Sequence, residues 1–93
     1  MKEHKMDDFE TKQIKFMLKN LIRWQLESVE NVKEQYFGIQ AGQFVVNYLH
    51  DLGMFVKSHN LNITDEEWQK LYMECSEKAR IEFLEESNKV LNN

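Results

Sequence analysis

The sequence predicts an all-α protein, and three observations support that fold class. Proline is absent and only three glycines occur in 93 residues, so the usual breaks of sheet-and-turn folds are missing. Apolar residues recur at helical steps of three and four through most of the chain. Hydrophobic residues make up 42% and charged residues 30% of the composition, which is typical of a globular chain. We expect a single helical-bundle domain over residues 1–93, with frayed ends at 1–6 and 92–93.

The middle of the chain has the most regular pattern and predicts a helix over residues 40–58. Its apolar residues repeat at steps of three, one and four and fall within one arc of the helix, while polar residues fall outside that arc. This pattern indicates a buried helix. The apolar residues are Ala41, Phe44, Val45, Tyr48, Leu49, Leu52, Phe55 and Val56.

A third helix is predicted over residues 65–91, after the clearest start signal in the chain. Thr64 and Glu67 have the spacing of a capping box. Ile63 and Trp68 are placed for the hydrophobic staple that often accompanies such a box.

The first helix is predicted over residues 8–36, with Asp7 and Glu10 as a weaker cap pair. Gly38 is the expected terminator, because glycine suits the left-handed position that follows many helices. Two alternatives stay open. The first helix could break near Ser28, or it could continue through Gly38 as one rod to residue 58.

Three long helices with joints near Gly38 and Asn60 predict an up-down-up bundle. Such a bundle is either closed by itself or completed by dimerisation.

Composition also restricts the location and the partners of the protein. No apolar run approaches the roughly 20 residues of a membrane span, and no signal-peptide core follows the charged start. The single cysteine, Cys75, has no partner for an internal disulfide. We therefore expect a cytoplasmic protein without membrane contact. The net charge of −4 argues against nucleic acid as a partner.

No catalytic residue, metal ligand or cofactor site is predicted, and we expect a protein that is not an enzyme. His50 lies opposite the apolar arc and is expected in solvent, whereas His59 continues the buried line into a joint. A metal site formed by His59, Cys75 and Glu82 is conceivable, but its spacing matches no common ligand pattern. Glu82 and Glu86 share the apolar arc of the third helix, so we expect them to be exposed or paired with the basic first helix.

Five residues of the first helix form a candidate partner-binding face, because they follow each other at steps of 3, 4, 3 and 4. Two interpretations stay open. The face could bind an acidic, partly apolar partner protein. Alternatively, its aromatic residues could be core and its cations could pair with the acidic third helix. The five residues are Phe9, Lys12, Phe16, Lys19 and Arg23.

Two further stripes are candidate oligomer faces. Small residues on one flank of the middle helix suggest a close crossing with another helix, within the chain in preference to a dimer. A minor apolar stripe on the third helix, beside Arg80, favours a contact between copies. The first stripe is Gly42, Val46, Leu49 and Gly53, and the second is Met73, Leu84 and Leu91.

The leading functional hypothesis is a non-enzymatic regulatory module that binds another protein through helix surfaces, either as a monomer or as a homodimer. The alternative is a small nucleic-acid-binding regulator with a helix-turn-helix formed by the second and third helices. Two features weaken this alternative. Residues 58–64 make a long turn for that motif, and the acidic third helix would be repelled by phosphate.

Overall fold

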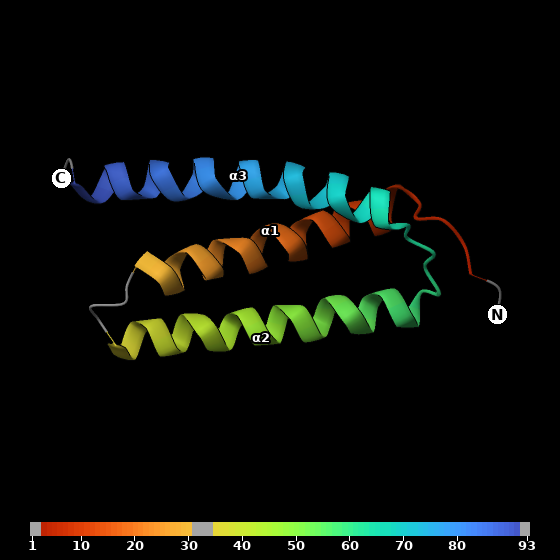
Figure 1. The fold of residues 1–93 in the computed structure, drawn as a ribbon, viewed down its shortest axis with the longest axis horizontal. Helices are drawn as coiled ribbons and strands as arrows, with labels where there is room; N and C mark the ends of the chain where they lie inside the picture. The colour runs from red at the N-terminus through yellow and green to blue at the C-terminus, as the bar shows by residue number, and fades with distance from the viewer. Residues whose placement is uncertain (1–2, 31–34, 92–93) are drawn as a thin grey trace.

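The computed structural model describes residues 3–30 and 35–91, and these residues form three helices. They are α1 (Asp8–Glu30), α2 (Gln35–Ser58) and α3 (Asp65–Leu91). The chain runs along α1, returns along α2 and runs forward again along α3 (Figure 1). The predicted all-α class and the up-down-up order of three helices are therefore confirmed.

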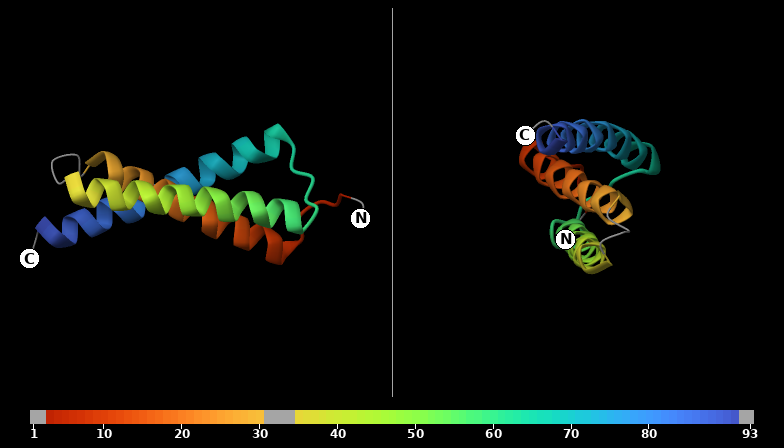
Figure 2. Two further views of the ribbon diagram at one scale, coloured as in Figure 1. Left: turned by 90° about the horizontal axis from the view of Figure 1, so that it is seen from below. Right: turned by 90° about the vertical axis from the view of Figure 1, so that its left-hand side faces the viewer.

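Helix α1 is the spatial centre of the molecule. It packs against both α2 and α3, whereas the backbones of α2 and α3 do not approach each other in the described residues. The view along the long axis shows the three helices as a row with α1 between the other two (Figure 2). The particle is accordingly elongated, with extents of 50 × 23 × 20 Å. The helix with the most regular apolar pattern, α2, thus lies at an edge of the row.

The predicted joint at Gly38 is wrong. Helix α1 passes Ser28 without a break and ends at Glu30, and α2 begins at Gln35, so Gly38 lies inside α2. The single-rod alternative is wrong as well, because α2 runs back alongside α1. A glycine inside a helix costs only about 1 kcal/mol relative to alanine, which the packing of α2 against α1 can offset.

The core lies along α1 and is made of apolar side chains from all three helices and the second joint. Helix α1 provides four of these residues, which is consistent with its central place. The buried cluster is Ile14, Leu18, Leu21, Ile22, Leu52, Leu61, Leu71, Cys75 and Ala79. Outside this cluster, the ring of Trp24 on α1 stacks on the ring of Phe44 on α2, with 4.5 Å between the ring centroids.

The segment before α1 is attached to the joint between α2 and α3. The backbone N–H of His4 donates to the carbonyl of Asn60 at 2.9 Å, and the carbonyl of His4 accepts from the N–H of Asn62 at 2.8 Å. Asn60 has a positive φ of 54°, a conformation that asparagine tolerates better than most residues. The expectation of a frayed segment up to residue 6 is therefore wrong for His4.

Both predicted helix caps are present. Asp7 Oδ1 accepts from the N–H of Glu10 at 2.7 Å, and Glu10 Oε1 accepts from the N–H of Asp7 at 3.0 Å. At α3, Thr64 Oγ1 accepts from the N–H of Glu67 at 3.2 Å. Each pair satisfies backbone donors that the first turn of a helix leaves without a partner.

Replacing Thr64 by alanine is expected to lower the free energy of unfolding by about 1 kcal/mol, because the N–H of Glu67 loses its acceptor. Urea unfolding followed by circular dichroism measures this loss. Thr64→Ser keeps the hydroxyl and is the control, with a smaller loss. Equal stabilities of Thr64→Ala and the wild type would show that this cap does not stabilise the fold.

Candidate interaction surfaces

The two phenylalanines of the predicted partner-binding face lie on the surface. Phe9 is 61% exposed and Phe16 is 56% exposed, on the side of α1 that neither α2 nor α3 covers. Lys12 lies between them and is exposed as well. We call Phe9, Lys12 and Phe16 the α1 face. Its aromatic residues do not belong to the core.

The two other cations of the predicted face are turned towards α3. Lys19 Nζ lies 3.0 Å from Glu82 Oε1. Arg23 pairs with Glu86, and its guanidinium carbon lies 5.9 Å from the centre of the Phe83 ring. The expectation that both glutamates are exposed or paired with the first helix is therefore confirmed. The helical spacing predicts that the five residues lie on one side of α1. The long side chains of Lys19 and Arg23 nevertheless extend to α3.

A third cation, Lys15, extends this row of ion pairs between α1 and α3. Lys15 Nζ lies 3.2 Å from a carboxylate oxygen of Glu74, and its hydrogen bond lowers the pKa of that carboxyl group. Next to Glu74, the Cys75 thiol is buried and lies 3.6 Å from the carbonyl oxygen of Lys15. Burial raises the pKa of Cys75, which disfavours the reactive thiolate. This cysteine is therefore a packing residue.

The small-residue flank of α2 faces solvent. Val46 is 58% exposed and Leu49 is 59% exposed. A Cβ atom built on Gly42 or Gly53 would meet no atom within 4 Å. The expected close crossing within the chain is therefore wrong. The reason is that α3 packs on α1, so no described residue of another helix covers this flank of α2.

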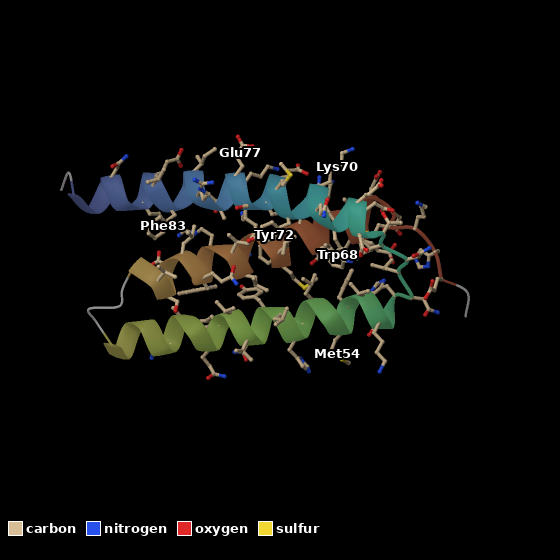
Figure 3. The ribbon with its side chains drawn as sticks, in the orientation of Figure 1. Met54, Trp68, Lys70, Tyr72, Glu77 and Phe83 are labelled. Carbon is tan, nitrogen blue, oxygen red and sulfur yellow. The ribbon has the colours of Figure 1, made fainter. Side chains whose placement is uncertain are left out.

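Helix α3 has an exposed apolar stripe on the side away from α1. Met73 is 72% exposed and Leu84 is 60% exposed, with the exposed side chains of Glu77 and Arg80 between them. We call these four residues the α3 outer face. Glu77 is seen on the side of α3 that is remote from α1 (Figure 3). The Leu91 side chain, the third apolar member of the predicted stripe, lies outside the described residues.

The α3 outer face borders a shallow, open hollow of about 560 Å³. Among the described residues, those that line the hollow all belong to α3, and the hollow is not an enclosed cavity. Its lining residues are Tyr72, Met73, Ser76, Glu77, Arg80, Ile81 and Leu84.

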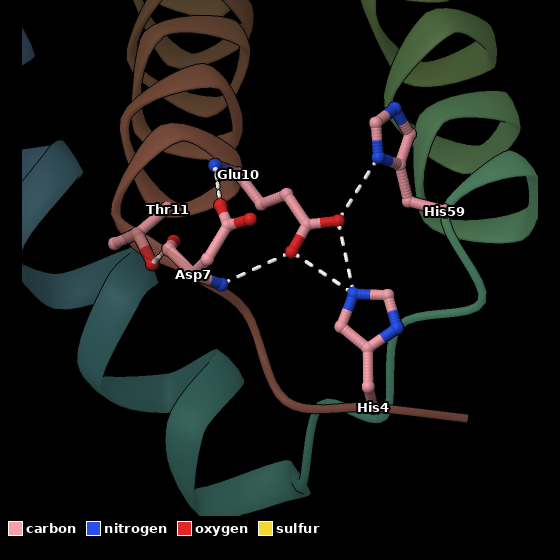
Figure 4. Close-up of polar contacts among 5 residues, drawn as sticks. All are labelled: His4, Asp7, Glu10, Thr11 and His59. Atoms are coloured by element: carbon pink, nitrogen blue, oxygen red, sulfur yellow. Dashed lines mark hydrogen bonds and ion pairs between the residues drawn. The ribbon is translucent and has the colours of Figure 1, made fainter. Parts of the chain in front are cut away.

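A buried carboxylate links the segment before α1, α1 itself and the joint that follows α2. The Glu10 side chain is 4% exposed, and its two oxygens face His4 Nε2 at 3.1 Å and His59 Nδ1 at 2.9 Å (Figure 4). The backbone N–H of Asp7 is the main group that lowers the pKa of Glu10, against an opposing effect of burial. The residue spacing predicts the cap role of Glu10 and places His59 on a buried line in a joint, whereas the His59 side chain is 38% exposed. The contact between Glu10 and His59 and the part played by His4 are not predicted.

None of these groups forms a metal centre. The part of the chain that the structure describes contains no cluster of three or more His, Cys, Asp or Glu side chains placed to bind a metal ion. In the conceivable set, His59 contacts Glu10, the Cys75 thiol faces the backbone of α1, and Glu82 pairs with Lys19. The three residues are therefore not brought together. The side chain of His50 is 73% exposed, as its place on the helix predicts.

The geometry also differs from a helix-turn-helix. The two helices of that motif are joined by a turn of three to four residues. Here, residues 59–64 separate α2 from α3, and the backbones of the two helices do not approach each other within the described part of the chain.

Comparisons of the chain with protein-family models, with curated proteins and with solved structures found no match. Across residues 3–30 and 35–91, no helix combines the length and the apolar character needed to cross a lipid bilayer.

Proposed function

We propose that the protein is a non-enzymatic regulatory module that binds another protein in the cytoplasm. The observation that carries this proposal is the α1 face. Two phenylalanines, each more than half exposed, lie on the uncovered side of the central helix. They are seven residues apart, which is about two helical turns, or roughly 10 Å. A pair of aligned aromatic side chains on one helix side is typical of a surface that a partner covers.

The charge beside these rings indicates the chemistry of the partner. Lys19 and Arg23 form ion pairs with glutamates of α3. Of the three cations in the predicted partner-binding face, Lys12 is therefore the one available to a partner. A partner with two apolar side chains about two turns apart and a carboxylate between them would fit. Phe9 and Phe16 would provide the binding energy, and Lys12 would fix the register of the complex. Regulation would then follow from occupancy of the partner's surface.

The test combines Phe9→Ser with Phe16→Ser in the full chain and measures affinity capture from native lysate by quantitative mass spectrometry. Loss of two buried phenylalanine contacts is expected to reduce capture of the specific partner by about tenfold or more. Stability should change by less than about 0.5 kcal/mol, because both rings are exposed in the free protein.

Val29→Ser is the matched control, since Val29 is a 67% exposed apolar residue of α1 outside the α1 face. The proposal requires at least one protein that the wild type and the control capture and that the double variant loses. If all three chains capture the same proteins in the same amounts, the α1 face is not the binding surface.

A further inference from the structure

The α3 outer face is symmetric in its sequence. Met73, Glu77, Arg80 and Leu84 follow each other at steps of four, three and four, so the spacing reads the same from either end. The chemistry is symmetric as well, because an apolar residue lies at each end and the two charges in the middle are opposite. All four side chains are exposed on the same side of α3.

Such a pattern is complementary to itself in one orientation. If two α3 helices pack antiparallel about a two-fold axis midway between Glu77 and Arg80, Glu77 of each copy faces Arg80 of the other. Met73 of each copy then faces Leu84 of the other. A parallel pair would instead place glutamate against glutamate and arginine against arginine, which is repulsive. The charges therefore select the antiparallel pair.

The acidic character of α3 does not oppose this pairing, because much of its negative charge is neutralised on the side towards α1. In the described residues, four of the α3 carboxylates pair with cations of α1 or of the segment before it. These carboxylates are Glu67, Glu74, Glu82 and Glu86.

The geometry points to a homodimer in which the α3 outer face packs against α3 of a second copy in antiparallel orientation. The occupant of the shallow hollow beside Met73 and Leu84 is then the same face of the second copy. This surface is separate from the α1 face, so the inference does not depend on the proposed function. A contact between single helices is small, and we expect a dimer with micromolar affinity.

Sedimentation equilibrium of the full chain, at concentrations up to about 100 µM, tests the inference. The wild type is expected to be in monomer–dimer exchange. Arg80→Glu places two carboxylates opposite each other at each of the two symmetric contacts of the dimer. Glu77→Arg places two guanidinium groups opposite each other at the same contacts. Each variant alone is expected to associate about tenfold or more weakly than the wild type. An equimolar mixture of the two variants restores opposite charges at both contacts and is expected to dimerise again.

A second measurement determines the orientation. In the antiparallel pair, Met73→Cys on one chain faces Leu84→Cys on the other, so a mixture of the two variants should form a disulfide-linked heterodimer under mild oxidation. Each variant alone should cross-link poorly, since equivalent positions lie far apart about the two-fold axis. The native Cys75 is 1% exposed and is not expected to compete. Circular dichroism of each variant confirms that the helices are retained.

Three outcomes would overturn the inference. They are a wild type that stays monomeric up to that concentration, a charge-variant mixture that does not associate, and cross-linking of each cysteine variant with itself. Phe9→Ser combined with Phe16→Ser should leave self-association unchanged. Self-association thus tests the α3 outer face alone, and partner capture tests the α1 face alone, so either hypothesis can fail without the other.

Discussion

Replacing Ile14 by alanine is expected to lower the free energy of unfolding by about 2–5 kcal/mol. Ile14 is 0% exposed and lies on α1, where the core receives side chains from both neighbouring helices. The shorter side chain loses buried apolar contacts and leaves a cavity that the rigid row of helices fills only in part. Because a small domain has a total stability of about 5–15 kcal/mol, this is a large fraction of it.

Urea unfolding followed by far-ultraviolet circular dichroism measures the effect. Val29→Ala removes apolar atoms from an exposed position on the same helix, so its stability should stay within about 0.5 kcal/mol of the wild type. If the two variants lose the same amount of stability, the core is not centred on α1 as described.

Acidification is expected to destabilise the protein as the pH falls below about 4.5, the ordinary pKa of a glutamate side chain. The pKa of Glu10 is lowered in the folded state, first by the hydrogen bond from the Asp7 backbone, so folding favours its ionised form. The stability that this group contributes is present above pH 4.5 and is lost as the pH falls through the lower folded-state pKa. Hydrogen bonds from Lys5 to Glu67 and from Lys15 to Glu74 likewise lower the pKa values of these two carboxyl groups, so their contribution to stability is also lost on acidification.

Glu10→Gln should therefore be less stable than the wild type at neutral pH and should lose less further stability on acidification. Thermal unfolding midpoints measured from neutral pH to about pH 3 test this. Glu85→Gln changes an exposed carboxylate of α3 and should follow the wild-type curve. A Glu10→Gln curve parallel to that of the wild type would show that Glu10 does not contribute to the acid response.

The elements that sequence analysis predicted correctly depend on short separations along the chain. The caps join residues three positions apart, as in Asp7 with Glu10 and Thr64 with Glu67, and helical periodicity is a property of neighbouring turns. The first joint was misplaced because the local preference of Gly38 for a helix end is weaker than the packing of α2 on α1.

The surfaces were harder to predict, because periodicity shows which side of a helix is apolar but not what covers it. Phe44 and Leu49 belong to the apolar arc of α2, yet they are 43% and 59% exposed, since α2 has α1 as its one neighbouring helix in the described residues. The contact between Glu10 and His59 joins residues 49 positions apart. A buried capping carboxylate needs hydrogen-bond partners. This requirement of Glu10 is the one feature of the sequence that could have indicated a contact with a histidine.

The sequence separation between α1 and each of its two neighbours leads us to expect an order in which the helices assemble. Helices α1 and α2 are neighbours in sequence and form a local hairpin, whereas the ion pairs between α1 and α3 join residues that are 59 to 63 positions apart. Local contacts close shorter loops and form sooner. We therefore expect α1 and α2 to make the folding nucleus, with α3 docking last and detaching first in partial unfolding.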